Sequence, residues 1–258
     1  QLYLGSTSVA TKLLTPTAPT NTIPALTSLN PGALQAVQFV QSPALARNFL
    51  GANVSASLWL STQNLPPETY RLNLSLLDNG TPIVSLHPVF TLANPGYQVV
   101  NFSFGNLNYT FDEGHRIGLS IRNLLGSTDN LLLRYNATSY ASRLNLVTTT
   151  YVSIDDLTLV DPVVGKSLWS PLDPILVRAN VSDPFGAGRI AGAWITITSP
   201  SGSLVATGPM PVLATDPSGL PAWTLFNDSL SPPLTTGSYR VDVVAKEDNG
   251  VADRARGF

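Results

Sequence analysis

The residues with the clearest chemical pattern are asparagines that precede Ser or Thr by two positions. This spacing is the acceptor pattern for N-linked glycans. It occurs at Asn53, Asn73, Asn79, Asn101, Asn108, Asn136, Asn180 and Asn227. Polar faces of β-strands also alternate Asn with Ser or Thr, so the spacing leaves both interpretations open. We predict glycans on several of these sites, with Asn79 the weakest acceptor because Pro82 follows its Thr81.

One short segment combines a histidine with two acids. His115 follows Asp112 and Glu113, and such a set could bind a metal ion or transfer protons. The same residues are typical of a turn whose polar side chains bond to nearby backbone amides, and we favour that interpretation. His87 precedes Pro88, and we expect a structural role for it.

Two more carboxylates are adjacent, at Asp155 and Asp156. Neighbouring side chains on a strand point to opposite faces, so this pair cannot flank one glycosidic bond. One of them, or Asp112 or Asp129, could supply an oxygen ligand to a structural Ca²⁺ ion. We name no catalytic residue, no metal ligand and no cofactor-binding residue.

Aromatic residues and missing residue types limit the remaining chemistry. The chain has no Cys, which excludes thiol catalysis, disulfides, zinc fingers and iron–sulfur clusters. It has no Gly-x-Ser-x-Gly elbow, no Gly-rich phosphate loop and no His-Glu-x-x-His motif. Four tryptophans could form a sugar-stacking platform, although we favour a place in a core or an interface: Trp59, Trp169, Trp194 and Trp223.

These residues lie in a chain that alternates apolar and polar side chains. The period of 2 is clearest in residues 53–60, 70–76, 100–104 and 116–122. Turn residues separate these segments, and no segment above about 10 residues keeps a helical period. The sequence therefore predicts an all-β protein made of antiparallel β-sandwiches. We expect glycans first on Asn73, Asn101 and Asn136, because the alternation places them on outward faces.

Length and composition suggest two domains. The chain has 258 residues, of which 43% are hydrophobic and 12% charged, and a net charge of −2. We predict a first sandwich at residues 1–160 and a second at residues 161–258. Within the first, residues 1–14 form an N-terminal strand. Residues 15–32 contain four prolines and form a linker or a long loop.

The first sandwich resembles a known family in the segments 40–48, 56–60, 111–119 and 139–144. They are similar to the galactose-binding-like jelly roll found C-terminal to X-prolyl dipeptidyl-peptidase-like hydrolases. The Gly114-His115-Arg116 element before an alternating strand is the most specific of them. Residues 152–159 look like the closing strand of carbohydrate-binding jelly rolls. The resemblance implies a scaffold that carries no catalytic residue.

The second sandwich resembles bacterial and archaeal immunoglobulin-like surface repeats. The similarity rests on residues 180–186, 193–202 and 236–241. It implies an immunoglobulin-like fold of the kind that occurs in pili, filaments and surface layers.

Composition also indicates where the chain works. Lys is nearly absent, and hydroxyl residues are abundant, which is common outside the cell. There is no basic patch for nucleic acid and no apolar run of about 18–20 residues for a membrane helix. Gln1 is typical of a mature chain after signal cleavage, and the end at Phe258 leaves a following tail or anchor open. We expect an extracellular or cell-surface protein.

Two functions from different classes fit these observations, and the sequence favours the first. The first is a non-catalytic structural subunit of a filament, pilus or surface layer, whose partners are other copies of the chain. The second is a carbohydrate-binding or adhesive module of a larger secreted protein, whose partners are surface glycans. An accessory domain of a hydrolase is a weaker third option. For assembly, we predict that residues 1–14 pair with a neighbouring copy. The alternative is that they form the first strand of their own jelly roll.

Overall fold

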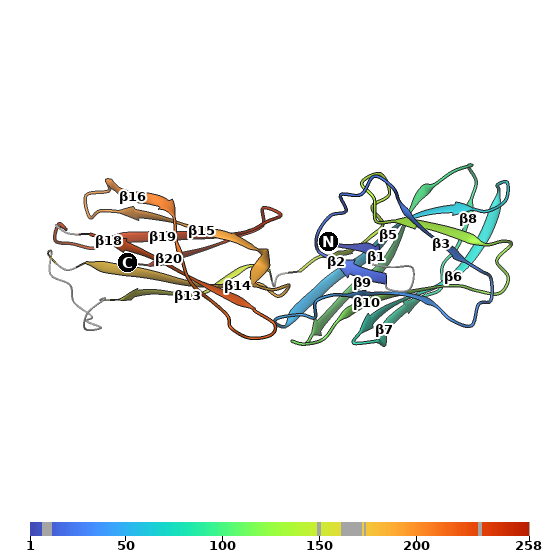
Figure 1. Cartoon of the computed structure of the whole chain (residues 1–258), viewed down its shortest axis with the longest axis horizontal. Helices are drawn as coiled ribbons and strands as arrows, with labels where there is room; N and C mark the ends of the chain where they lie inside the picture. The colour runs from blue at the N-terminus through green and yellow to red at the C-terminus, as the bar shows by residue number, and fades with distance from the viewer. Residues whose placement is uncertain (7–11, 149–150, 161–171, 173, 232–233, 258) are drawn as a thin grey trace. The chain divides into compact units, whose positions relative to one another are not determined.

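The computed structural model describes the chain except for residues 7–11, 149–150, 161–171, 173, 232–233 and 258. The described residues form twenty β-strands and one 3-10 turn, η1 (Ala187–Arg189). The predicted all-β class is therefore confirmed. The strands divide into two compact units, which are residues 1–44 with 49–149, and residues 45–48 with 150–258. Figure 1 shows the strands of both units.

Unit 1 is built from one continuous set of hydrogen-bonded strands. They are β1 (Leu2–Ser6), β2 (Lys12–Thr15), β3 (Ala25–Leu29), β4 (Val37–Gln41), β5 (Phe49–Thr62), β6 (Glu68–Asp78), β7 (Thr81–Leu86), β8 (Val89–Leu92), β9 (Gln98–Phe111), β10 (Ile117–Asn123), β11 (Leu131–Tyr135) and β12 (Arg143–Leu146). Their order is β3-β11-β5-β12-β1-β2-β4-β10-β6-β7, with β8 beside β6 and β9 beside β5. The long β5 therefore pairs with β9 on one side and with β11 and β12 on the other.

The alternating segments of the sequence supply the core of unit 1. The apolar members of β5, β6 and β10 are buried: Val54, Ala56, Leu58, Leu60, Tyr70, Leu72, Leu74, Leu76, Ile117, Leu119 and Ile121. Because side chains on a strand alternate between faces, the intervening residues point to the opposite face, where Ser57, Ser75 and Ser120 are also buried. This burial of apolar area is the main source of stability for the sandwich.

The N-terminal segment pairs within unit 1. β1 is antiparallel to both β12 and β2, and β2 is parallel to β4. Leu2, Leu4 and Leu14 are completely buried in these pairings. In this structure of a single chain, the described part of residues 1–14 pairs within its own unit, as in the intramolecular alternative, and pairing with a neighbouring copy stays a prediction. The described part of the segment also forms two strands instead of one.

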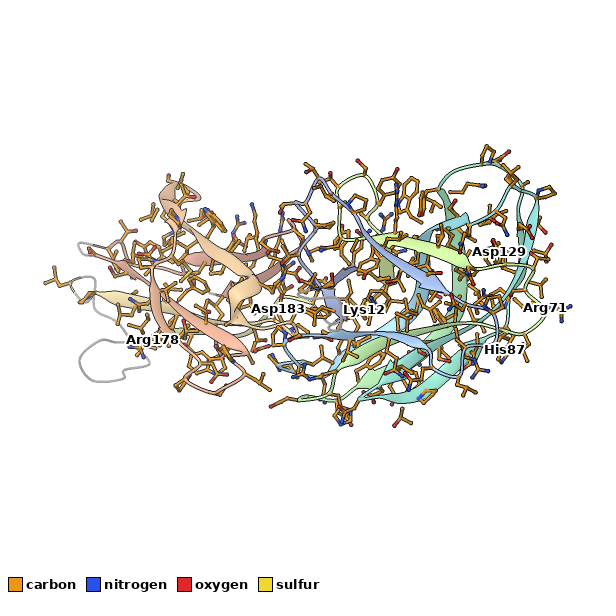
Figure 2. All side chains as sticks on the ribbon, turned by 45° about the vertical axis from the view of Figure 1, so that its right-hand side comes forward. Lys12, Arg71, His87, Asp129, Arg178 and Asp183 are labelled. Atoms are coloured by element: carbon orange, nitrogen blue, oxygen red, sulfur yellow. The ribbon has the colours of Figure 1, made fainter. Side chains whose placement is uncertain are left out.

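A lysine fastens this segment to the rest of the unit. Lys12, which is labelled in Figure 2, donates from Nζ to Thr27 Oγ1 and to Tyr135 OH, both at 2.9 Å. Thr27 belongs to β3, which lies inside the stretch 15–32 that the sequence assigns to a linker or loop. That assignment is wrong for Ala25–Leu29, because five residues without proline follow Pro24 and pair with β11.

Unit 2 is a sandwich of two four-stranded sheets. Its strands are β13 (Ser153–Val160), β14 (Ile175–Ser182), β15 (Ile190–Thr198), β16 (Leu204–Pro209), β17 (Val212–Thr215), β18 (Trp223–Leu230), β19 (Arg240–Glu247) and β20 (Ala252–Gly257). One sheet has the order β13-β14-β18-β17 and the other β16-β15-β19-β20. The core between them consists of inward residues of both sheets, including Val177, Ala179, Ile195, Phe226 and Val243.

The boundary between the units lies earlier than the sequence suggests. β13 pairs with β14 over most of its length, so it belongs to unit 2 and does not close unit 1. The alternation in residues 153–160 identifies a strand, but a single strand's pattern does not say which partner it pairs with.

Candidate functional site

A row of four outward side chains crosses one face of unit 1. Arg134 of β11 lies opposite Leu26 of β3 and opposite Trp59 of β5, and Trp59 lies opposite Val99 of β9. Leu26 is 55% exposed and Val99 44% exposed. The row therefore places one tryptophan and one guanidinium between two exposed aliphatic side chains.

Two tyrosines from loops extend this row into a compact group. The Tyr140 ring contacts the Trp59 ring at 5.3 Å and the Tyr97 ring at 5.6 Å between centroids, both edge to face. The guanidinium carbon of Arg134 lies 4.0 Å from the centroid of Tyr97 and 4.9 Å from that of Tyr140. We call Trp59, Tyr97, Arg134 and Tyr140 the aromatic cluster. All four side chains are half-buried.

The local backbone explains how the tyrosines reach the cluster. Tyr97 follows a turn at Asn94-Pro95-Gly96, where Gly96 has a φ of 86°, a conformation that favours glycine. Tyr140 lies in a tight turn after β11, and its N–H donates to the carbonyl of Ala137 at 3.1 Å. Each turn brings its ring back over the strands of the cluster.

A buried serine supports the cluster from below. Ser142 is completely buried. Its Oγ accepts a hydrogen bond from the backbone N–H of Trp59 at 2.8 Å and donates one to the backbone carbonyl of Arg134 at 2.6 Å. These two hydrogen bonds link the backbone of β5 at Trp59 to the backbone of β11 at Arg134. Burial raises the pKa of the Tyr97 hydroxyl, and the nearby Arg134 opposes that shift. Tyr97 therefore stays neutral at ordinary pH.

The cluster offers the contacts that carbohydrates use. Partly exposed aromatic rings pack against the C–H faces of a sugar, and a guanidinium donates hydrogen bonds to its oxygens. Trp59 is the member of the cluster that the sequence singled out as a sugar-stacking candidate. Tyr97, Arg134 and Tyr140 were missed, because two lie at loop positions and the third becomes a neighbour of Trp59 only through strand register.

The other tryptophans do not join this group. Trp194 of β15 is 38% exposed, with Lys246 Nζ 5.0 Å from its ring, and Trp223 is half-buried on β18. Both belong to unit 2. Trp169 lies outside the described residues.

The predicted glycan acceptors differ in exposure. The exposed acceptors are Asn53, Asn79, Asn101 and Asn108, and the half-buried ones are Asn73, Asn136, Asn180 and Asn227. The prediction that Asn136 occupies an outward position on a strand is wrong. Asn136 follows the end of β11 and has a φ of 61°.

Asn79 also has a structural role. It precedes Gly80 in the β6–β7 turn, and both residues have positive φ, of 46° and 84°. This is the preferred pair for a two-residue hairpin turn, so the asparagine serves the backbone there whether or not it carries a sugar.

His115 lies in the turn before β10, but its side chain bonds to a distant carboxylate and not to a local backbone amide. Its N–H bonds to the Asp112 carbonyl at 3.1 Å, and its Nδ1 lies 2.9 Å from Asp78 Oδ1. Tyr109 OH donates to the other oxygen of Asp78 at 2.8 Å. Asp78 is almost fully buried, and it links β6, β9 and the turn before β10. Glu113, in the same turn, is exposed. His87 is exposed too, and Figure 2 shows it at the same end of unit 1 as Arg71 and Asp129.

The acids proposed for a Ca²⁺ ion are not brought together. Asp129 Oδ2 accepts from the Asn64 N–H at 2.9 Å, and Asp155 pairs with Arg47 at 2.7 Å. Asp112 and Asp156 are exposed. Within the part of the chain that the structure describes, no three His, Cys, Asp or Glu residues gather as a metal site.

Unit 2 contains a buried carboxyl pair that the sequence did not reveal. Asp183, labelled in Figure 2, is completely buried, and Glu247 is 8% exposed. Glu247 accepts from the Val152 N–H at 3.3 Å and from Asn249 Nδ2, while Asp183 Oδ1 accepts from the Phe185 N–H at 2.7 Å. Asp183 Oδ2 is buried without a donor.

Burial and the neighbouring Glu247 charge together raise the pKa of Asp183 to about 7. A proton on Asp183 would relieve the repulsion between the two carboxylates.

Among the described residues, no helix is long and apolar enough to cross a membrane.

No family model matches the chain. Among solved structures, it is similar to an aminopeptidase from the marine sediment archaeon Thaumarchaeota archaeon, with 9% identity, a TM-score of 0.43, and coverage of 57% of this chain and 36% of that one. A β-glucuronidase from Bacteroides uniformis matches with 13% identity, a TM-score of 0.31, and coverage of 78% and 26%. A GH2 β-galacturonidase from Eisenbergiella tayi matches with 11% identity, a TM-score of 0.25, and coverage of 99% and 41%.

The chain thus spans less than half the length of each of these proteins, and the likeness is remote. None of the three is an X-prolyl dipeptidyl-peptidase-like protein or an immunoglobulin-like surface repeat, so both of those resemblances stay predictions.

Proposed function

We propose that the chain is a non-catalytic carbohydrate-binding module of a larger secreted protein, and that the aromatic cluster is its sugar-contacting surface. The observation that carries the proposal is the gathering of three aromatic rings and one guanidinium on the outward face of β5 and β11. Aromatic residues in soluble domains usually bury their rings or sit at binding surfaces. A group of this kind left half-exposed on a sheet is therefore a candidate binding surface.

The position of the cluster supports binding over catalysis. Its hydroxyl and guanidinium groups lie on a flat strand face, and among the described residues no carboxylate pairs with Arg134. Most glycosidases use two carboxylates that flank the bond they cleave. The cluster offers stacking and hydrogen bonding without such a pair.

Export and N-glycosylation are part of the same proposal. Asn101 lies opposite Ser57 on β5, one outward position along β9 from the Val99–Trp59 pair. A glycan on Asn101 would reach the cluster, so binding should be measured on both glycosylated and unglycosylated chain. Enhanced binding after removal of N-glycans would be consistent with this placement.

A glycan array with the complete chain tests the proposal, using Trp59→Ala and Tyr140→Ala as variants and Trp194→Ala as the control. We expect saturable binding to one glycan class, at least about tenfold weaker in the two cluster variants, since 1.4 kcal/mol of lost contact corresponds to a factor of ten. Trp194→Ala should bind as the wild type does. Absence of binding, or equal binding by all folded variants, would count against the proposal.

The structural-subunit hypothesis makes a different prediction. That hypothesis expects copies to assemble by exchanging residues 1–14 with one another. In the structure, the described part of this segment pairs with strands of its own unit. Electron microscopy of native material separates the two functions, because ordered polymers favour the structural subunit and dispersed glycan-binding monomers favour the module.

A further inference from the structure

The guanidinium of Arg134 is held in an unusual way for a surface arginine. Tyr97 and Tyr140 lie over it at 4.0 and 4.9 Å from its central carbon. Cation–π attraction of this kind holds a guanidinium against aromatic rings and does not itself consume its N–H donors. Arg134 also makes a side-chain hydrogen bond to Tyr97, which leaves its other N–H groups for a ligand.

Among the residues that the structure describes, the donors of Arg134 have no anionic partner. No ion pair and no side-chain hydrogen bond of Arg134 to a carboxylate occurs among the described residues, and its nitrogens are absent from the buried polar atoms that lack a partner. Arg134 itself is half-buried. By contrast, Arg47, Arg189, Arg240 and Arg256 each pair with an aspartate.

The surroundings of this cation are apolar. Leu26 and Val99 lie at the two ends of the strand row, and Trp59 is directly opposite Arg134. A ligand that fits must offer a C–H face to the rings and leucine, and a planar anion to the guanidinium. A sugar that carries a carboxylate has both parts on one ring, whereas a neutral sugar has only the first.

We propose that the aromatic cluster selects glycans that contain carboxylated sugars, with Arg134 donating two parallel hydrogen bonds to the sugar carboxylate. The inference rests on the proposed glycan-binding function. Arginine and carboxylate match as a bidentate pair, and such charge-assisted bonds are stronger than neutral ones. Lysine at the same position would keep the charge but lose both the fork and the stacking.

Isothermal titration of the complete chain with oligogalacturonate, and with the same oligosaccharide after methyl esterification of its carboxylates, tests the inference. The two ligands share their sugar rings and differ in charge. We expect the free acid to bind at least about tenfold more tightly than the ester at low salt. Arg134→Gln should bring the two affinities together, and Arg134→Lys should recover only a small part of the difference.

Arg71→Gln serves as the matched control, because Arg71 is an exposed arginine of the same unit on β6, outside the cluster. It should leave the acid-to-ester ratio unchanged. A circular dichroism melt for each variant establishes that it is folded, and Arg134→Lys provides a second variant if Arg134→Gln does not fold.

The possible outcomes distinguish a failure of the carboxylate preference from a failure of glycan binding itself. Equal affinity of wild type for acid and ester, with both weakened by Trp59→Ala, would overturn the carboxylate preference and leave glycan binding in place. Binding of neither ligand, together with an empty glycan array, would overturn both. Equal affinity for a sulfated neutral oligosaccharide would overturn the selectivity for carboxylated sugars, because a sulfate also offers two oxygens to the arginine fork.

Discussion

At the scale of single residues, the structure shows which polar groups serve the fold and which remain available. His115, Tyr109 and Asp78 satisfy one another, and Lys12 is satisfied by two hydroxyl groups. The guanidinium of Arg134 lies over two tyrosine rings and pairs with no described carboxylate. That contrast is the reason for placing function at the aromatic cluster and not at the histidine that the sequence brings to attention.

The Asp183–Glu247 pair predicts how unit 2 responds to pH. The folded-state pKa of Asp183 is about 7, against an ordinary value of 3.8. The folded chain therefore binds more protons than the unfolded chain between these pH values. Stability from this group is present at low pH and is lost as pH rises from about 4 to about 7, by roughly 4 kcal/mol at most.

Urea unfolding of wild type and Asp183→Asn across pH 4 to 8 measures this effect as a difference. We expect the variant to lose the dependence and to be the more stable of the two at pH 8, because an amide carries no charge. Asp216→Asn is a control whose stability should depend on pH in the opposite direction. Hydrogen bonds from the backbone N–H groups of Ala222 and Ser218 lower the pKa of Asp216. Its contribution is present at neutral pH and is lost as pH falls. A constant difference between wild type and Asp183→Asn would refute the assignment.

Exposure ranks the glycan acceptors. Asn101 is exposed on an outward strand position, whereas Asn180 and Asn227 each have a buried Oδ1 without a partner. We expect Asn101 to be modified in native protein, and Asn180 and Asn227 to be modified less. Peptide mapping by mass spectrometry, with Asn101→Gln as the control, measures the occupancy. An unmodified Asn101 beside a fully occupied Asn180 would contradict the ranking.

At the scale of elements, the N-terminal strands are the clearest case of a segment whose role depends on its partners. β1 and β2 fill the place between β12 and β4. Burial of a leucine side chain stabilises a fold by about 1.5–3 kcal/mol, and this segment buries Leu2, Leu4 and Leu14. Its removal would also leave two open strand edges.

Deletion of residues 1–14 should therefore unfold or aggregate unit 1. Leu4→Asp should destabilise it strongly in chemical denaturation, because the substitution buries a charge in the core. Leu34→Asp is the matched control, since Leu34 is 95% exposed, and we expect a change within about 0.5 kcal/mol. A soluble, folded monomer after the deletion would instead support exchange between copies.

The strands also show which features of the fold a sequence pattern can predict and which it cannot. Alternation identified β5, β6 and β10 and their inward residues, because a period of 2 is a local property. It did not reveal that β13 pairs with β14, nor that Ala25–Leu29 forms β3, because pairing depends on distant residues. Arg134 and Trp59 are 75 positions apart, and only the register of β11 on β5 makes them neighbours.

At the scale of the whole molecule, two all-β units carry different chemistry. Unit 1 presents the aromatic cluster, and unit 2 contains the buried carboxyl pair. The sequence predicted the all-β class because every strongly alternating segment indicates a strand. It did not predict the aromatic cluster, which combines residues of two strands with residues of two loops.

The most direct test of the account is a crystal structure of the complete chain with a bound acidic oligosaccharide. The account predicts a sugar ring packed on Trp59 and Tyr140, with its carboxylate on the N–H edge of Arg134. A sugar bound elsewhere on the chain, with the aromatic cluster left open to solvent, would contradict it.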